Sequence, residues 1–189
     1  MRYLSIDTET TGLNPKEHQV IEFGAVIEDT VHYKTLSILP VFHCMINYDQ
    51  ILGSAYALQL NYRILKELAK PTGNVLILKP HEVGSKFLEW LIKNEFVPDE
   101  NGLLTVNVAG KNFSQFDMKF LEKLPKFFDR LKFKQRIIDP AILFMDWKKD
   151  DCLPSLKECK ERCNIDGEVT HNAVDDALDV IKILRTKYY

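Results

Sequence analysis

The stretch over residues 3–13 constrains the fold most strongly, because an apolar segment runs directly into two carboxylates and a turn. Side chains alternate between the two faces of a β-strand, so Asp7 and Glu9 are expected on one face and Leu4 and Ile6 on the other. Neighbouring carboxylates repel one another unless a cation lies between them, and Mg²⁺ prefers carboxylate oxygens. The stretch therefore predicts a metal site at the end of a strand. A strand that simply ends in polar surface residues is the alternative.

A second cluster of reactive side chains follows an apolar run. Residues 103–109 predict a strand buried on both faces, which indicates a central sheet covered by helices. Asn112, Phe116 and Asp117 come next, and residues 118–124 read as a helix. Asp117 then lies where a strand leads into a helix. The alternative is that Asp117 or Ser114 is only a helix N-cap.

A third cluster begins the last predicted helix. A polar loop over residues 164–170 ends at His171, and Asn172 is a suitable N-cap. Asp176 lies within one residue of the apolar stripe of this helix, so its carboxylate can point inward and needs a partner, for which a metal is the simplest candidate. Asp175 and Asp179 are expected to be solvated or to stabilise the helix N-terminus. The stripe itself comprises Ala173, Ala177, Val180, Ile181 and Leu184.

The three clusters together resemble the motifs of the DEDDh 3′–5′ exonucleases, the DnaQ-like family. Residues 5–13 are similar to the first motif, and residues 112–117 fit the second, Asn-x-x-x-Phe-Asp. Residues 171–177 match the third, His-x-Ala-x-x-Asp-Ala, at every fixed position. The resemblance implies an α/β, ribonuclease H-like fold with a mixed five-stranded sheet flanked by helices. It also implies one exonuclease domain over residues 1–189.

The resemblance further implies an activity and the residues that carry it. A metal-dependent 3′–5′ exonuclease would release nucleoside 5′-monophosphates from the 3′ end of single-stranded DNA or RNA. The implied cofactors are two divalent cations, Mg²⁺ or Mn²⁺, with His171 as the general base for the attacking water. The implied metal ligands are Asp7, Glu9, Asp117 and Asp176, which complete the catalytic set with His171. The implied substrate contacts are Thr8, Thr10, Gly12, Leu13 and Asn112, with Leu13 wedged against a base.

Other functions stay open at this point. The chain could be a proofreading subunit that acts with a DNA polymerase, and a second copy of the chain is another candidate partner. A non-catalytic nucleic-acid-binding module on the same fold is less well supported, because all five catalytic side chains are present. The sequence does not distinguish DNA from RNA as the substrate, since it offers no recognisable 2′-hydroxyl reader.

Composition excludes several classes of protein. The chain has 189 residues, of which 46% are apolar, and no apolar run approaches the roughly 20 residues of a membrane helix. Without the layout of a signal peptide, it is expected in the cytoplasm and away from membranes. A net charge of −2 argues against a protein that coats nucleic acid, although residues 111–136 are rich in Lys and Arg. A zinc site is an alternative that matches no common zinc spacing; it would use Cys152, Cys159, Cys163 and His171.

Periodicity predicts the remaining elements. Strands are expected over residues 19–28, 34–39, 42–46 and 134–138, with 34–39 as the hairpin partner of 19–28. Helices are expected over residues 57–70, 82–94, 155–163 and from 173 onward. Ser155 and Glu158 have the spacing of a capping box at the start of the third of these helices.

Overall fold

The computed structural model describes residues 1–167 and 169–189. Its strands are β1 (Arg2–Thr10), β2 (Val20–Asp29), β3 (Val41–Ile46), β4 (Leu76–Leu78), β5 (Leu104–Val106), β6 (Val108–Ala109) and β7 (Leu131–Phe133). Its α-helices are α1 (Ala55–Leu60), α2 (Tyr62–Ala69), α3 (Val83–Lys93), α4 (Asp117–Leu121), α5 (Leu156–Arg162) and α6 (Ala173–Tyr188). Two 3₁₀ helices, η1 (Leu36–Ile38) and η2 (Pro140–Phe144), lie in the connections.

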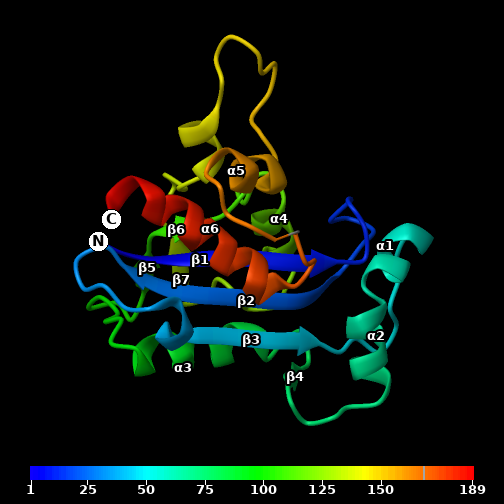
Figure 1. The fold of residues 1–189 in the computed structure, drawn as a ribbon. Helices are drawn as coiled ribbons and strands as arrows, with labels where there is room; N and C mark the ends of the chain where they lie inside the picture. The colour runs from blue at the N-terminus through cyan, green and yellow to red at the C-terminus, as the bar shows by residue number, and fades with distance from the viewer. Residues whose placement is uncertain (168) are drawn as a thin grey trace.

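Five strands form one mixed sheet in the order β4-β3-β2-β1-β6. β1 pairs antiparallel with β2 along its whole length and parallel with β6 on its other side. Helix α6 crosses β1 and β2 on one face, and α3 lies on the opposite side of the sheet near β3 (Figure 1). The predicted five-stranded α/β fold is confirmed.

The alternation of β1 assigns its side chains to two different environments. Leu4 and Ile6 are buried in the larger core, under α3 and α4. Ser5 faces α6, where its Oγ donates a hydrogen bond of 2.7 Å to the carbonyl oxygen of Ala177. Asp7 and Glu9 share the face of Ser5, so the sheet presents both carboxylates toward α6.

The larger core is rich in phenylalanine. Phe23 of β2 lies edge-on to Phe87 of α3, with ring centroids 4.9 Å apart, and also contacts Phe127. Edge-to-face pairs of this kind contribute about 0.5–1.5 kcal/mol beyond the area that they bury. These contacts pack β2 against α3 on the face of the sheet opposite the carboxylates.

The second face of the sheet is covered by α6. Val180, Ile181 and Leu184 pack against Tyr3 and Val26 in a separate apolar cluster. The hydroxyl groups of Tyr3 and Tyr188 are 2.8 Å apart, and the two chain ends lie close together (Figure 1). The predicted stripe of this helix is therefore confirmed as its buried face.

Three strand predictions were wrong in detail. Residues 34–39 contain η1 rather than a strand, and β3 is the hairpin partner of β2, because the register that pairs Val26 with Val41 leaves the intervening residues as a connection. The run 103–109 is broken at Asn107, whose side chain donates to the carbonyl oxygen of Arg2, so β5 and β6 belong to different sheets. Residues 134–138 contribute only a bridge at Ile138, and the strand is β7 instead.

Asp179 was also misplaced by the sequence prediction. Only 3% of it is exposed, and its carboxylate binds the buried Lys160 of α5 as well as Lys182, whose Nζ lies 2.6 Å away. The helical periodicity puts Asp179 three residues after Asp176, on the same buried side of α6. This carboxylate therefore ties α5 to α6 and is not solvated.

The cysteines serve as apolar or exposed side chains. Cys159 is buried against Ala141 and Ile183, whereas Cys152 is exposed. Among residues 1–167 and 169–189, no group with metal-binding geometry includes a cysteine. The zinc alternative is therefore not supported.

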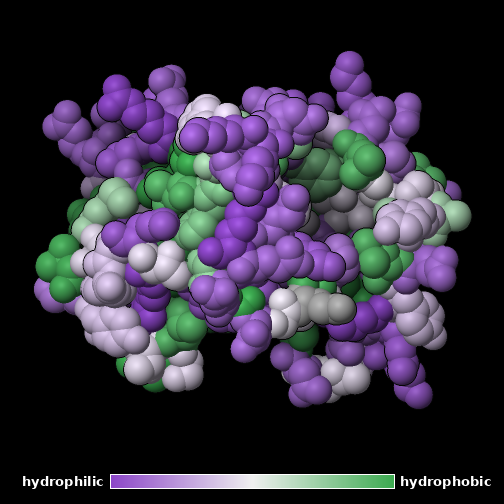
Figure 2. Space-filling view, turned by 45° about the horizontal axis from the view of Figure 1, so that its top comes forward, coloured by the Kyte–Doolittle hydropathy of each residue, from purple (hydrophilic) through white to green (hydrophobic). Residues whose placement is uncertain are grey.

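The surface is mostly hydrophilic on the face shown in Figure 2, with hydrophobic residues in separate patches. In the part of the chain that the structure describes, no helix has the length and apolar character of a membrane span.

Candidate active site

The end of β1 forms a tightly bonded turn. The register with β2 shifts between Glu9 and Thr10, and the Thr10 hydroxyl donates to the carbonyl oxygen of Gly12 at 2.8 Å. A Cβ on Gly12 would lie 2.6 Å from the ring of His18, so a larger residue there would have to displace that ring. Leu13 follows with 82% of its surface exposed.

Asp117 joins the second cluster to β1. It begins α4 and is buried, and its Oδ1 accepts hydrogen bonds from the backbone N–H of Thr8 at 3.0 Å and from the Thr8 hydroxyl at 2.7 Å. Thr8 was predicted as a substrate contact, yet its hydroxyl is already engaged by Asp117. These two bonds place the second carboxylate cluster beside the first.

The first turn of α6 supplies the third cluster. Asn172 is the predicted N-cap, and its Oδ1 accepts from the backbone N–H groups of Val174 and Asp175 at 3.0 and 3.3 Å. His171 precedes it with a φ of 51°, and its side chain is exposed. Ligand atoms of Glu9, His171 and Asp176 all lie within 4.8 Å of one another, a separation that a single metal ion could bridge.

The pKa values of the four carboxyl groups are all raised. Burial raises the pKa of Asp7 well above its usual value, and repulsion from Asp117 and Asp176 raises it further. Burial, followed by repulsion from Glu22, raises the pKa of Glu9 to about 8. Burial raises the pKa of Asp117 to about 7 and that of Asp176 to about 6. These buried carboxylates repel one another when ionised, and a bound cation would relieve that repulsion.

One atom tests whether a metal fits. Oδ1 of Asp176 is buried and has no hydrogen-bond partner among the residues that the structure describes. An unpaired buried oxygen is costly, and hard divalent cations bind carboxylate oxygen. The donor set of carboxylates with one imidazole therefore fits a divalent cation. Asp7 and Asp117 lie outside the three-residue group but are coupled to it through their charges.

Asn112 takes a position at the rim. Its φ is 56°, a left-handed conformation that asparagine tolerates better than most residues, and its backbone N–H donates to Asp139 at 2.8 Å. Its side chain is exposed, as a substrate contact requires.

A comparison with protein-family models identifies the chain. The model described as RNase_T, exonuclease, matches residues 4–184. The chain belongs to the RNase_T exonuclease family. The predicted resemblance to an exonuclease family is thereby confirmed. No curated protein sequence matched the chain significantly.

Solved structures of several nucleases share the fold of this chain. The nuclease domain of 3′hExo, a DEDDh family member bound to rAMP, is 20% identical with a TM-score of 0.66, over 97% of this chain and 89% of that one. Cell-death related nuclease 4 is 16% identical with a TM-score of 0.66, over 98% of this chain. Exonuclease I of E. coli, in complex with a dA16 oligonucleotide, is 16% identical with a TM-score of 0.62, over 98% of this chain. This chain spans 62% and 41% of the lengths of the latter two.

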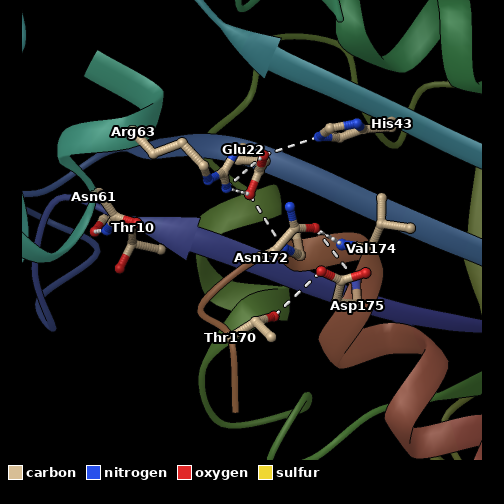
Figure 3. Close-up of polar contacts among 10 residues, drawn as sticks. Thr10, Glu22, His43, Asn61, Arg63, Thr170, Asn172, Val174 and Asp175 are labelled. Carbon is tan, nitrogen blue, oxygen red and sulfur yellow. Dashed lines mark hydrogen bonds and ion pairs between the residues drawn. The ribbon is translucent and has the colours of Figure 1, made fainter. Parts of the chain in front are cut away.

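The sequence prediction missed one charged network beside these carboxylates. Glu22 lies on β2 opposite Glu9 and binds Arg63, His43 and the backbone of Ala173 (Figure 3). A glutamate in the middle of the apolar run 19–28 was the available signal, because a charge rarely lies in a buried strand without a partner.

Proposed function

We propose that the chain is a 3′–5′ exonuclease that hydrolyses phosphodiester bonds from the 3′ end of single-stranded nucleic acid and releases nucleoside 5′-monophosphates. The observation that carries this proposal is the convergence of Glu9, His171 and Asp176, which are far apart in the sequence, within 4.8 Å. The whole unit, residues 1–189, would act as one domain.

Asp7, Glu9, Asp117 and Asp176 would hold two divalent cations, Mg²⁺ or Mn²⁺. When bound, the ions would stabilise the negative charge that develops on the attacking and departing oxygens. The unpaired oxygen of Asp176 and the raised pKa values of all four carboxyl groups support this assignment. S. pombe Pop2p, 15% identical with a TM-score of 0.64, was solved with Mg²⁺ and Mn²⁺ bound.

His171 would be the general base. Its imidazole lies beside Glu9 and Asp176 and is exposed, so a water molecule can reach it. A neutral imidazole accepts the proton of an attacking water, which makes the oxygen a better nucleophile. The proton would then leave to solvent from the exposed ring.

The rim residues would bind the terminal nucleotide. The exposed Leu13 offers an apolar face to a base, and Asn112 offers an amide. The hydroxyls of Thr8 and Thr10 already donate within the protein, so these residues and Gly12 would contact the substrate through their backbone or methyl groups.

A time course on 5′-labelled single-stranded DNA and RNA of identical sequence tests the proposal, with Mn²⁺ or Mg²⁺, with chelator, and with an Asp7→Ala control. We expect a ladder that shortens from the 3′ end and disappears with chelator or with the substitution. Faster degradation of the DNA or of the RNA shows whether the enzyme prefers deoxyribose or ribose. Degradation of neither strand would overturn the proposal of a freestanding enzyme, and adding a polymerase would then test the proofreading alternative.

A further inference from the structure

Glu22 is a completely buried glutamate at the border of the active site. Its exposure is 0%, and it lies directly opposite Glu9 in the pairing of β1 with β2. Although it is next to the proposed metal ligands, both of its carboxylate oxygens are occupied by protein donors. It therefore differs from Asp176, whose Oδ1 is unpaired among the described residues.

Three elements converge on this carboxylate. Arg63 of α2 places Nη2 at 3.0 Å from Oε1 and 2.8 Å from Oε2, and His43 of β3 places Nε2 at 2.9 Å from Oε1. The backbone N–H of Ala173, the first residue of α6, donates to Oε2 at 3.1 Å. Figure 3 shows Glu22 between the guanidinium group and the start of α6. Burial opposes ionisation, but the hydrogen bonds from His43, Arg63 and Ala173 together lower the pKa of Glu22.

The bond to Ala173 acts where α6 closely approaches the backbone of the sheet. A Cβ on Gly24, two residues after Glu22, would lie 2.5 Å from the carbonyl carbon of Ala173. The start of α6 therefore lies directly on the backbone of β2. Ala173 is two residues after His171 and three before Asp176, so a shift of this helix end moves both side chains relative to Glu9.

The structure assigns Glu22 the role of a positioning residue that holds the first turn of α6 so that His171 and Asp176 meet Glu9. This role rests on the proposed exonuclease function. Arg63 adds a second effect, since its charge partly offsets the rise in the pKa of Glu9. Outer partners of metal ligands commonly change metal affinity or activity by 10–100-fold when they are replaced.

Glu28 provides a matched control on the same strand. It is also 0% exposed and faces α6, and it binds Arg185 near the other end of that helix, with Oε2 2.7 Å from Nε. Replacing Glu28 removes an ion pair between β2 and α6 whose carboxylate is as buried as that of Glu22. If Glu22 acts only through stability, Glu28→Gln should also lower activity.

The experiment compares Glu22→Gln, Glu22→Ala and Glu28→Gln with the wild type at a temperature where circular dichroism shows all four to be folded. We expect both Glu22 variants to lower kcat on the order of 10–10²-fold with a small change in KM, since a displaced reacting group is costly. The Mn²⁺ concentration for half-maximal rate should rise about tenfold. Glu28→Gln should lower Tm but keep kcat and the Mn²⁺ dependence.

Two measurements do not depend on turnover. Titration calorimetry with Mn²⁺ alone should show weaker binding in the Glu22 variants, and hydrogen exchange should become faster in the first turns of α6. If the wild type degrades no substrate, the proposed function fails while these two measurements still decide the role of Glu22. Unchanged kcat and Mn²⁺ affinity in Glu22→Ala, or equal losses in Glu28→Gln, would overturn the inference.

Discussion

Asp176 has one buried carboxylate oxygen that lacks a hydrogen-bond partner among the described residues. The lack of a partner costs stability in the metal-free protein, and the same oxygen gains a ligand when a cation binds. Stability and function therefore oppose one another at this side chain, which makes opposite responses to a single substitution measurable.

Asp176→Asn should raise the stability of the metal-free protein and weaken its response to metal. The amide keeps the shape of the side chain but removes one like charge, and since the pKa of Asp176 is raised to about 6, we expect a gain on the order of 1–3 kcal/mol near pH 8. Thermal unfolding with chelator and with Mg²⁺ measures both effects. A variant that is less stable without metal would contradict the electrostatic explanation.

His171→Ala should lower turnover by a factor on the order of 10²–10⁴, because the variant lacks the group that accepts a proton from water. Mn²⁺ binding should change little, since the carboxylates supply most of the ligands. Single-turnover rates and an Mn²⁺ titration separate the two effects. Full activity in the variant would remove His171 from the mechanism.

The sequence predicted which residues form the site better than it predicted which groups each of them contacts. The spacing of His171 and Asp176 was enough to place both at one helix start, and the structure brings them to Glu9. It could not show that Asp117 binds the Thr8 hydroxyl, because that bond depends on how α4 meets β1. The error at Asp179 has the same origin, since its partner Lys160 comes from another helix.

At the scale of elements, the contact between β2 and α6 decides where the third cluster lies. Gly24 allows the start of the helix to approach the strand backbone without an intervening side chain. The geometry of the site therefore depends on the distance between α6 and β2 as well as on the proposed ligands themselves.

Gly24→Ala should destabilise the protein by about 1–3 kcal/mol, since the added methyl group overlaps the backbone of Ala173. It should also lower kcat, because α6 must move away from β2 and takes Asp176 with it. Gly84→Ala is the control: its Cβ would lie 2.7 Å from the Cα of Phe127, on the face of the sheet opposite α6. Urea unfolding should show similar losses of stability in the two variants. Measurements of kcat should show a loss of activity only in Gly24→Ala.

Elements with a strong local pattern were predicted well. The helix at 82–94 is α3, and the capping box at Ser155 and Glu158 is present at the start of α5. Short strands were less predictable: β4 was not expected, and β5 and β6 were merged. Such short strands form only where a neighbouring strand offers a pairing partner. The local sequence does not show whether that partner is present.

At the scale of the whole molecule, the carboxylate cluster links stability, pH and metal. Carboxyl groups with raised pKa values hold protons in the folded state that the unfolded chain has released, so the stability of the metal-free protein falls as pH rises. The values of about 6, 7 and 8 for Asp176, Asp117 and Glu9 place this fall between about pH 4 and pH 8.

The stabilisation by Mg²⁺ should accordingly grow as pH rises from 5 to 8, because the ion binds the deprotonated carboxylates. Tm measured with chelator and with Mg²⁺ across this range tests the linkage. The Asp7→Ala variant is the control and should show a weaker dependence on pH. If the difference between the Tm with Mg²⁺ and the Tm with chelator stays constant from pH 5 to pH 8, the predicted linkage is wrong.

The order of the three clusters along the chain also determines when activity can arise during synthesis. β1, with Asp7 and Glu9, is synthesised before the helix that supplies Asp176 and covers their face of the sheet, and that helix follows all seven strands of the described residues. A nascent or prematurely terminated polypeptide that lacks α6 has neither the third cluster nor the apolar cover of β1. The complete group of Glu9, His171 and Asp176 can therefore assemble only after α6 has been synthesised.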